Sequence, residues 1–416
     1  MDTAEDSAPP PPPLLPAHPC GLQFLEPLQG LLEKLHALYP DPKRTLHYDQ
    51  YLLLLLLACY EPALQSLRAL QQASTLPELR KRLGLAQTSL GSLSEAAHNF
   101  NPEYLREIFL QLAAQTPACH GVSLPAGLPL HLWYLAVDGT LWSLLPRMAR
   151  EFYLQGPRPG RPPGFKAHVQ FDILRGVPVD AQLTEGYASE RRVLEASLRP
   201  HAFYLIDAGY IDFVLFQRIL DICSDFLIPA RPDTVYRVEE ERTVTPAAQE
   251  AGVLRDEIVR LGSAPHAGKL KQSLRVIHAR VVQPPPHNLC PTRRQGKHLP
   301  TPRGEVRWVE VTLITSDLQT APELLVQLYR YRWQIELFFR WLKCVLGCQH
   351  FISESENGFA LQLYASLIAT LLVVLCTGLR PSKRLQELMH FYLLGLLPWE
   401  ELQLRLAAFR AKQKKG

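Results

Sequence analysis

The sequence lacks several features that would place a protein in a class at once. No basic segment followed by an apolar core stands near its start, so we expect no secretory signal peptide. Cysteine is scarce, with 8 among 416 residues, and its scattered positions favour buried thiols in a reducing compartment. Four residues could be imagined as a zinc site: His287, Cys290, Cys344 and Cys348. The loose spacing within each pair disfavours that site.

A clean apolar run long enough to cross a membrane is also missing. The run at 52–57 is too short. The segment 359–379 has the length, but polar residues such as Gln362, Ser366 and Thr370 interrupt it. We therefore favour a buried core helix there, with a membrane protein as the alternative.

Acidic residues are absent from 258–304. The same stretch contains nine basic residues: Arg260, Lys269, Lys271, Arg275, Arg280, Arg293, Arg294, Lys297 and Arg303. Positive charge without interspersed acid suits phosphate binding. The net charge of the whole chain is only +4, so the local distribution carries the prediction of a polyanion partner. A solvated loop region that lacks acids by chance is the alternative.

Two short apolar runs, 131–137 and 203–206, are each followed by an aspartate, Asp138 or Asp207. Such runs predict buried strands. We expect both strands to end at these aspartates, where sites in α/β sheets usually lie. One aspartate in such a place often only caps a turn. The pair is informative because a third carboxylate accompanies it.

The third carboxylate, Glu336, lies on a helix that we expect to begin near Pro322. At about 100° per residue, five residues of this mostly apolar helix fall within roughly 80° of one another: Tyr329, Arg332, Glu336, Arg340 and Lys343. Burying such groups without partners is costly, so this polar stripe should face a polar site or a polyanion. The alternative is a surface salt bridge between Glu336 and Arg340, worth about 0.3–0.5 kcal/mol, which leaves the other three residues unexplained.

Asp138, Asp207 and Glu336 together have the chemistry of a divalent-metal site. Carboxylate oxygens are the ligands that Mg²⁺ and Mn²⁺ prefer. Clustered carboxylates repel one another unless a cation joins them. Two such ions can activate an attacking oxygen and stabilise a leaving oxygen at phosphorus. The three residues therefore indicate a site for two Mg²⁺ or Mn²⁺ ions.

The polar stripe also carries a resemblance. Its spacing, Tyr329-x2-Arg332-x3-Glu336-x6-Lys343, resembles the Tyr-Arg-Glu-Lys signature of the bacterial DDE transposases of insertion sequence family four. Four residue types at fixed spacing make this similarity specific.

The two aspartate segments resemble the same family. Leu-Ala-Val-Asp-Gly-Thr around Asp138 is similar to its first aspartate motif, and Leu-Ile-Asp-Ala-Gly-Tyr around Asp207 to its second. The chain departs at Ala208, where many members have a basic residue, which puts only a local contact in doubt. The resemblance covers about 130–350.

This resemblance implies an α/β fold. It consists of a ribonuclease H-like catalytic domain with a mostly β insertion, preceded by a helical domain and followed by C-terminal helices. We expect these boundaries: a disordered proline-rich leader at 1–20, a helical, DNA-binding domain at 21–124, the two parts of the catalytic domain at 125–230 and 317–380, the basic insertion at 231–316, and the C-terminal helices with a basic tail at 381–416.

The resemblance further implies a cut-and-paste DNA transposase. Asp138, Asp207 and Glu336 would hold the two metal ions. Four stripe residues would contact DNA: Tyr329, Arg332, Lys343 and Arg340. The expected partners are double-stranded DNA, as inverted-repeat ends and as target, and further copies of the chain in a homodimer or higher synaptic assembly. We expect a bacterial cytoplasmic protein, nucleoid-associated when bound to DNA, and no membrane. A catalytically inactive DNA-binding protein derived from a transposase is the alternative.

Trp308 lies where the basic insertion meets the strand expected at 307–315. Related transposases that cut through a hairpin stack an insertion-domain aromatic on a flipped base, and Trp308 occupies a matching place. The resemblance therefore implies a DNA contact for Trp308. The alternative is a core residue of a half-buried strand.

Overall fold

The structure is a computed structural model that describes most of the chain. The described residues are 25–38, 45–119, 124–143, 164–262, 270–282, 308–348, 351–353 and 355–413. The expected leader at 1–20 lies outside them, as do His287, Cys290 and several basic residues of the acid-free stretch.

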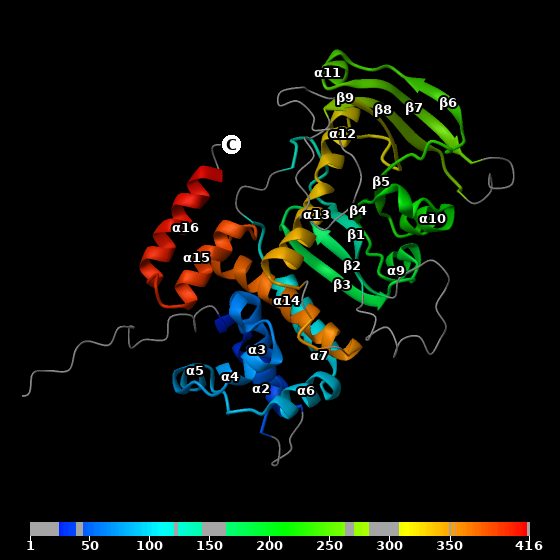
Figure 1. Ribbon diagram of the computed structural model, residues 1–416. Helices are drawn as coiled ribbons and strands as arrows, with labels where there is room; N and C mark the ends of the chain where they lie inside the picture. The colour runs from blue at the N-terminus through cyan, green and yellow to red at the C-terminus, as the bar shows by residue number, and fades with distance from the viewer. Residues whose placement is uncertain are drawn as a thin grey trace, which may run out of the picture. The chain divides into compact units, whose positions relative to one another are not determined.

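Tertiary contacts divide the chain into two compact units (Figure 1). The helical unit comprises Met1–Gly121, Pro146–Glu151 and Phe338–Gly416. The sheet unit comprises Val122–Leu145 and Phe152–Leu337. This division differs from the expected boundaries, because much of 317–380 groups with the N-terminal helices.

The helical unit is built around one long apolar helix, α14 (Glu356–Thr377). Its other described helices are η1 (Glu26–Leu28), α2 (Gln29–Ala37), α3 (Tyr48–Tyr60), η2 (Pro62–Leu64), α4 (Leu67–Ala73), α5 (Pro77–Leu83), α6 (Leu90–Asn99), α7 (Pro102–Gln115), η5 (Trp341–Val345), α15 (Lys383–Leu393) and α16 (Trp399–Gln413). Helix α14 contacts α3, α6 and α7 and is almost entirely buried.

Length and composition alone would let α14 cross a membrane, but the structure surrounds it with other helices. Its polar groups have partners inside the unit. The Tyr60 hydroxyl donates to the Ala369 carbonyl at 2.6 Å, and the Trp341 indole donates to Thr370 at 3.3 Å. The interruptions that the sequence shows in this helix are thus buried hydrogen-bonding groups, as a core helix requires.

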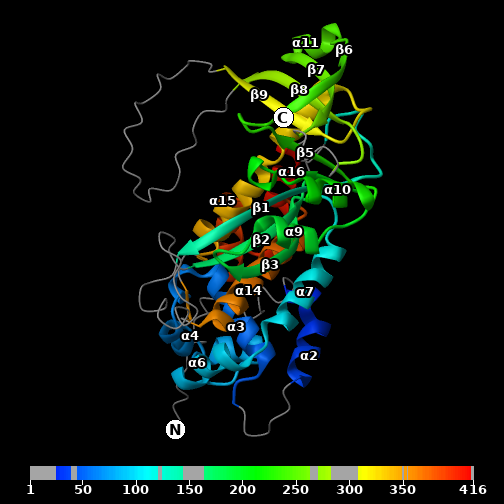
Figure 2. The ribbon, with the colours of Figure 1, turned by 90° about the vertical axis from the view of Figure 1, so that its right-hand side faces the viewer.

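The sheet unit contains a sheet of nine strands in the order β3-β2-β1-β4-β5-β9-β8-β7-β6. The strands are β1 (Trp133–Ser143), β2 (Gly164–Asp172), β3 (Val177–Glu185), β4 (Ala202–Leu205), β5 (Asp225–Pro229), β6 (Tyr236–Arg242), β7 (Val253–Leu261), β8 (Leu274–Val282) and β9 (Trp308–Thr315). Strands β1, β4 and β5 are parallel, and the remaining neighbours are antiparallel. Figure 2 shows β1, β2 and β3 side by side. The mixed α/β class expected from the sequence is confirmed.

Short helices lie between these strands or follow the last of them. They are α9 (Glu190–Ala196), η4 (Ala208–Tyr210), α10 (Phe213–Asp221), α11 (Pro246–Glu250), α12 (Pro322–Arg330) and α13 (Trp333–Arg340), the last of which crosses from the sheet unit into the helical unit. Helix α10 begins where Asp212 accepts the amides of Val214 and Leu215, which satisfies two free donors of its first turn.

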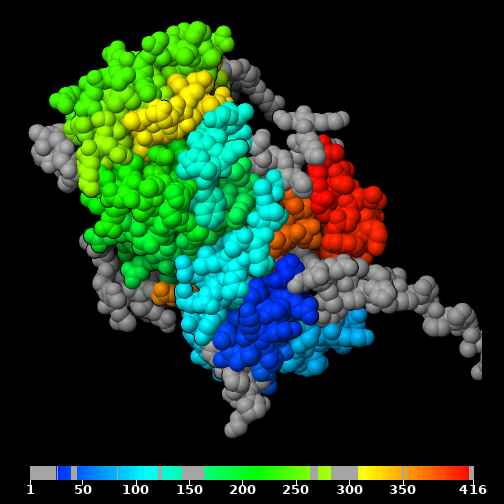
Figure 3. All heavy atoms as spheres, turned by 180° about the vertical axis from the view of Figure 1, so that it is seen from behind, coloured from blue at the N-terminus to red at the C-terminus, as the bar shows by residue number. Residues whose placement is uncertain are grey.

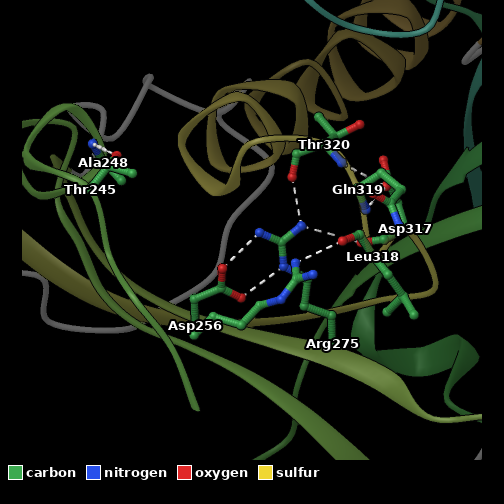
Figure 4. Close-up of polar contacts among 9 residues, drawn as sticks. Thr245, Ala248, Asp256, Arg275, Asp317, Leu318, Gln319 and Thr320 are labelled. Atoms are coloured by element: carbon green, nitrogen blue, oxygen red, sulfur yellow. Dashed lines mark hydrogen bonds and ion pairs between the residues drawn. The ribbon is translucent and has the colours of Figure 1, made fainter. Parts of the chain in front are cut away.

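The insertion between β5 and α12 is mostly β, and one buried arginine ties it to the loop before α12 (Figure 4). Arg275 of β8 donates to both carboxylate oxygens of Asp256 of β7, each at 2.7 Å, and to the Thr320 carbonyl at 2.6 Å. Arg242 of β6 donates to the neighbouring Leu318 carbonyl at 2.7 Å. The insertion strands therefore fix the start of α12.

These contacts correct the view of the acid-free stretch as a run of free positive charge. Arg275 is buried against Asp256, and Arg260 pairs with Glu239 of β6 at 3.3 Å. The acids are distant in sequence, but antiparallel pairing places them on adjacent strands. Of the nine basic residues, Lys269, Arg293, Arg294, Lys297 and Arg303 lie outside the described residues.

Candidate active site

The first two carboxylates meet because of the register between two parallel strands. Strand β1 pairs with β4 through Ala136 and Leu205. Asp138 and Asp207 stand two residues beyond this last pair, and they are near enough for the charge of Asp207 to raise the pKa of Asp138. Asp138 accepts the Gly139 amide at 2.7 Å, and Asp207 accepts the Gly209 amide at 2.7 Å.

Asp138 differs from its prediction in one respect. The sequence indicates a strand that ends at Asp138, whereas β1 continues to Ser143. Antiparallel β2 pairs with β1 as far as Ser143, while β4 stops at Leu205. Asp138 thus lies where β1 extends past its parallel neighbour, at an open edge. Asp207 stands just after the C-terminal end of β4, separated from it by Ile206, close to where the sequence predicts it.

The helix with the polar stripe is broken rather than continuous. Helix α12 ends at Arg330 and α13 begins at Trp333. In between, the amides of Tyr331 and Arg332 bond to carbonyls three residues earlier, which tightens the chain into a 3₁₀-like turn. The expected single helix is therefore interrupted at Arg332, but Arg332 still lies beside Tyr329 and Glu336 as the predicted face requires.

Arg332 links two of the carboxylates. Its guanidinium lies 3.6 Å from Asp138 Oδ2 and forms a short ion pair with Glu336. The side chains of Arg332, Asp138 and Glu336 are 17%, 21% and 30% exposed, so this cluster is accessible to solvent. Glu336 thus pairs with Arg332, not with Arg340 as the surface salt-bridge alternative supposed.

The electrostatics of the cluster are those of partly buried carboxylates. The pKa of Asp138 is raised to about 6, mainly by burial; Arg332 and the Gly139 amide act to lower it, and the charges of Asp207 and Glu190 act to raise it. For Arg332, burial acts to lower the pKa, but Tyr329, Glu336 and Asp138 outweigh it and leave the pKa raised.

Tyr329 belongs to the same cluster. Its hydroxyl donates to the Ile206 carbonyl at 3.4 Å, one residue before Asp207. Burial raises its pKa to about 12, so the phenol is neutral and able to donate a hydrogen bond.

The oxygen donors of Asp138, Asp207 and Glu336 suit a hard divalent ion. The described residues contain no three His, Cys, Asp or Glu side chains close enough together to hold one ion. Asp138 and Asp207 are near enough to interact electrostatically, whereas Glu336 reaches Asp138 through Arg332. The arrangement fits a metal site in the kind of donor, and the predicted three-carboxylate cluster is only partly formed.

Arg340 and Lys343 belong to the helical unit. Arg340 is the last residue of α13, and Lys343 lies in the π-helical turn η5, where burial lowers its pKa. Their contact with DNA stays a prediction. Cys348 is buried and donates to Ser366, while Cys344 is exposed, so these two differ in environment, unlike a ligand pair.

Trp308 lines a groove of about 580 Å³ at the insertion. It is 51% exposed, which contradicts its interpretation as a core residue, and the Arg280 guanidinium lies 5.9 Å from its ring centroid. Arg330, Tyr331 and Trp333 of the α12–α13 turn line the same groove. In Figure 3 the yellow segment that starts at β9 lies against the yellow-green insertion strands.

Two residues beside the site or the groove, Trp333 and Glu190, are not indicated by the sequence motifs. Trp333 is 38% exposed and lines the groove, and its position next to Arg332 is the one signal that the sequence offers. Glu190 pairs with Lys166 of β2 and lies beside Gly139. No local pattern marked it, because its proximity to Asp138 depends on how α9 packs.

The comparisons with known proteins agree with this geometry. A family model described as "Transposase DDE domain" matches residues 132–372, more than half of the chain. The chain therefore belongs to the DDE transposase family. The matched segment contains Asp138, Asp207 and Glu336, and the prediction of a DDE transposase is confirmed.

Two curated relatives are also named as transposases. The protein y4zB of Sinorhizobium fredii is 27% identical over 212 residues, which is 50% of this chain and 52% of that protein. A transposase named for insertion sequence element IS5377 of Geobacillus stearothermophilus is 23% identical over 217 residues, 52% of this chain and 50% of that protein. The chain spans about half the length of these relatives.

Among solved structures, a piggyBac transposase synaptic complex with hairpin DNA is similar over 95% of this chain and 86% of that chain. Its TM-score is 0.39 at 10% sequence identity, which is too low to establish a common fold.

Proposed function

We propose that this protein is a DNA transposase that cleaves the ends of a mobile element and joins them to target DNA. One observation carries the proposal: Asp138 of β1 and Asp207, which follows the parallel strand β4, are near enough to interact electrostatically, and Glu336 is joined to Asp138 through Arg332, all inside the segment that matches the DDE family.

We also propose the finer assignment to insertion sequence family four and to a ribonuclease H-like catalytic fold. The support is the Tyr329-x2-Arg332-x3-Glu336-x6-Lys343 spacing and the β insertion, which lies in the chain between the second aspartate and the glutamate.

In this proposal water attacks a phosphodiester at the element end, and the freed 3′-hydroxyl then attacks target DNA. The divalent ions that DDE transposases use, here two Mg²⁺ or Mn²⁺, would be held by Asp138, Asp207 and Glu336 and would activate the attacking oxygen and stabilise the leaving one.

The surrounding residues would position the DNA. Arg332 would contact a phosphate beside the carboxylates, with Tyr329 donating to an oxygen of the DNA backbone. Lys343 and Arg340 of the helical unit would contact DNA phosphates as well. Trp308 would stack on a flipped base in the insertion groove if the second strand opens through a hairpin. Its exposure and the adjacent Arg280 support this role.

The proposed partners are inverted-repeat ends, target duplex and further copies of the chain in a homodimer or larger synaptic assembly. The proposed location is the bacterial cytoplasm, on the nucleoid when bound to DNA. Matched inverted repeats in the DNA that flanks the gene would supply the substrate.

The test is strand cleavage by the purified full chain on duplexes that end in those repeats. We expect nicking with Mg²⁺ or Mn²⁺, while Ca²⁺ should support assembly better than chemistry because its coordination is looser. Scrambled repeats are the matched control. Tight end binding without cleavage under either metal would instead favour the inactive DNA-binding protein.

A further inference from the structure

One ion pair of the sheet unit lies directly beside the candidate site. Lys166 of β2 pairs with Glu190, the first residue of α9, and the side chains are 20% and 25% exposed. Their burial is close to that of Arg332 and Asp138. The pair is therefore part of the site's surroundings, not a pair of fully solvated charges.

The ion pair packs against the residue that follows Asp138. A Cβ added at Gly139 would lie 2.8 Å from Glu190 Oε1 and 3.0 Å from Lys166 Cε. A side chain at this position would therefore displace the ends of Glu190 and Lys166. The amide of the same Gly139 donates to Asp138 Oδ1 at 2.7 Å. The pair thus lies next to the residue whose amide orients the Asp138 carboxylate.

A second observation connects Glu190 to the other aspartate segment. Glu190 lines a small cavity of about 10 Å³, close to the space one water needs. Tyr210 lines it too, three residues after Asp207, and is 1% exposed. Its hydroxyl, His168 Nδ1 and Gln170 Oε1 are buried there without a hydrogen-bond partner among the described residues. Buried polar groups therefore line the cavity that Glu190 shares with Tyr210 of the Asp207 segment.

Another glutamate of α9 offers a contrast. Glu195 pairs with Arg218 of α10 at 2.5 Å, and that arginine is 59% exposed. Both glutamates are on one short helix and both are ion-paired, but only Glu190 packs against Gly139.

We propose that Glu190, held by Lys166, is a positioning residue that fixes the Gly139 peptide and so orients the Asp138 carboxylate for a divalent ion. This inference rests on the proposed function. It assigns Glu190 an indirect role, because its Oε1 is engaged by Lys166. Groups that orient metal ligands in this way typically change metal affinity by about 10- to 100-fold when removed.

The test measures Mn²⁺ binding to the full chain without DNA by calorimetry, next to its unfolding temperature. Glu190→Gln and Lys166→Met should each weaken Mn²⁺ binding by about 10- to 100-fold, and to a similar extent. Glu195→Gln is the matched control and should stay within about twofold of the wild type. In cleavage assays, the Mn²⁺ concentration for half-maximal rate should rise, while the rate at saturating Mn²⁺ should approach that of the wild type.

Gly139→Ala is a second test if either variant folds poorly. The added methyl group would displace the Lys166–Glu190 ion pair while keeping both charges. This variant should also weaken Mn²⁺ binding. Equal affinities for Glu190→Gln and Glu195→Gln would overturn the inference. Weak binding in Glu190→Gln with normal binding in Lys166→Met would also overturn it, because Glu190 would then be a ligand. A wild-type chain that binds no Mn²⁺ would refute the proposed function instead.

Discussion

Two arginines of the sheet unit are held by carboxylates, and they differ in how far water reaches them. The Arg275 side chain is 2% exposed, and it donates hydrogen bonds to both carboxylate oxygens of Asp256 and to the Thr320 carbonyl. Arg332 is 17% exposed and divides its contacts between Asp138 and Glu336, which come from a strand and a helix. Water is thus excluded from the ion pair of Arg275, whereas it reaches the ion pairs of Arg332.

The difference separates an ion pair that is shielded from water from one that water can reach. A buried pair with all its hydrogen bonds made fixes geometry but offers nothing to a ligand, and breaking it is costly. An exposed arginine between two carboxylates keeps donors and acceptors available for phosphate or metal. Both arginines belong to basic segments in the sequence, so charge alone could not tell them apart.

The largest effect is expected from substituting the carboxylates of the candidate site. Asp138→Ala, Asp207→Ala and Glu336→Ala should each slow strand cleavage by at least about 10³-fold, because a metal contributes several kcal/mol to the transition state. Binding to element ends should stay largely intact, since few phosphate contacts are lost. Single-turnover cleavage and gel-shift assays measure the two quantities. Asp221→Ala, at the exposed end of α10, is the control, and a near wild-type rate in any site variant would remove that residue from the site.

Substitutions in the buried pair of Arg275 and Asp256 should change the stability of the fold. Arg275→Met leaves Asp256 buried and unpaired, so we expect the free energy of unfolding to fall by about 3–5 kcal/mol. The double variant Arg275→Met/Asp256→Leu should regain much of this loss, because both charges are gone. Denaturant unfolding measures both variants. If Arg275→Met kept its stability and lost DNA binding, the comparison between the two arginines would be reversed.

A pH series tests the burial of Asp138. The unfolded carboxyl has its ordinary pKa of 3.8, whereas the folded one has a pKa of about 6, so the folded protein holds this proton more tightly. The contribution of Asp138 to stability should therefore fall as pH rises from about 4 to about 6, by up to about 3 kcal/mol. Asp138→Asn should lack this contribution. A constant difference in unfolding free energy between the two proteins over this range would contradict the raised pKa.

Substitution of Trp308 tests whether the insertion, which Arg275 holds in place, contacts DNA. Base stacking on an aromatic ring is worth about 1–3 kcal/mol, so Trp308→Ala should slow second-strand opening or hairpin formation by roughly tenfold. First-strand nicking should change much less. Trp308→Phe, which keeps a stacking face, should recover part of the rate. If both steps slowed equally and the melting temperature fell, the base-flipping role should be dropped.

The smallest expected effect concerns the salt dependence of DNA binding. Arg332→Ala and Lys343→Ala should each weaken binding and reduce the slope of log affinity against log salt by up to about one unit per lost phosphate contact. Stability should change little for Arg332, in contrast to Arg275. Unchanged slopes in both variants would leave Arg332 as a counter-ion of Asp138 and Glu336 alone.

Much of this site was accessible from local patterns. The apolar runs predicted the strands that lead to Asp138 and Asp207, and the parallel pairing of β1 with β4 then brought the two near each other. The fixed spacing from Tyr329 to Lys343 pointed to the family before any fold was known. The extension of β1 to Ser143 was not accessible, because it depends on pairing with β2, which lies further along the chain.

The sequence by itself determined which residues are chemically able to act, namely two aspartates that follow apolar runs and a glutamate on a helix, with basic and aromatic residues nearby. Periodicity and spacing are local properties, and they report local structure. The tertiary structure alone decided which charges meet: Arg275 with Asp256, Arg332 with Asp138 and Glu336, and Lys166 with Glu190 beside Gly139. The burial of a side chain and the choice of its partner depend on how distant segments pack. That packing makes Arg275 inaccessible to water and leaves Arg332 accessible.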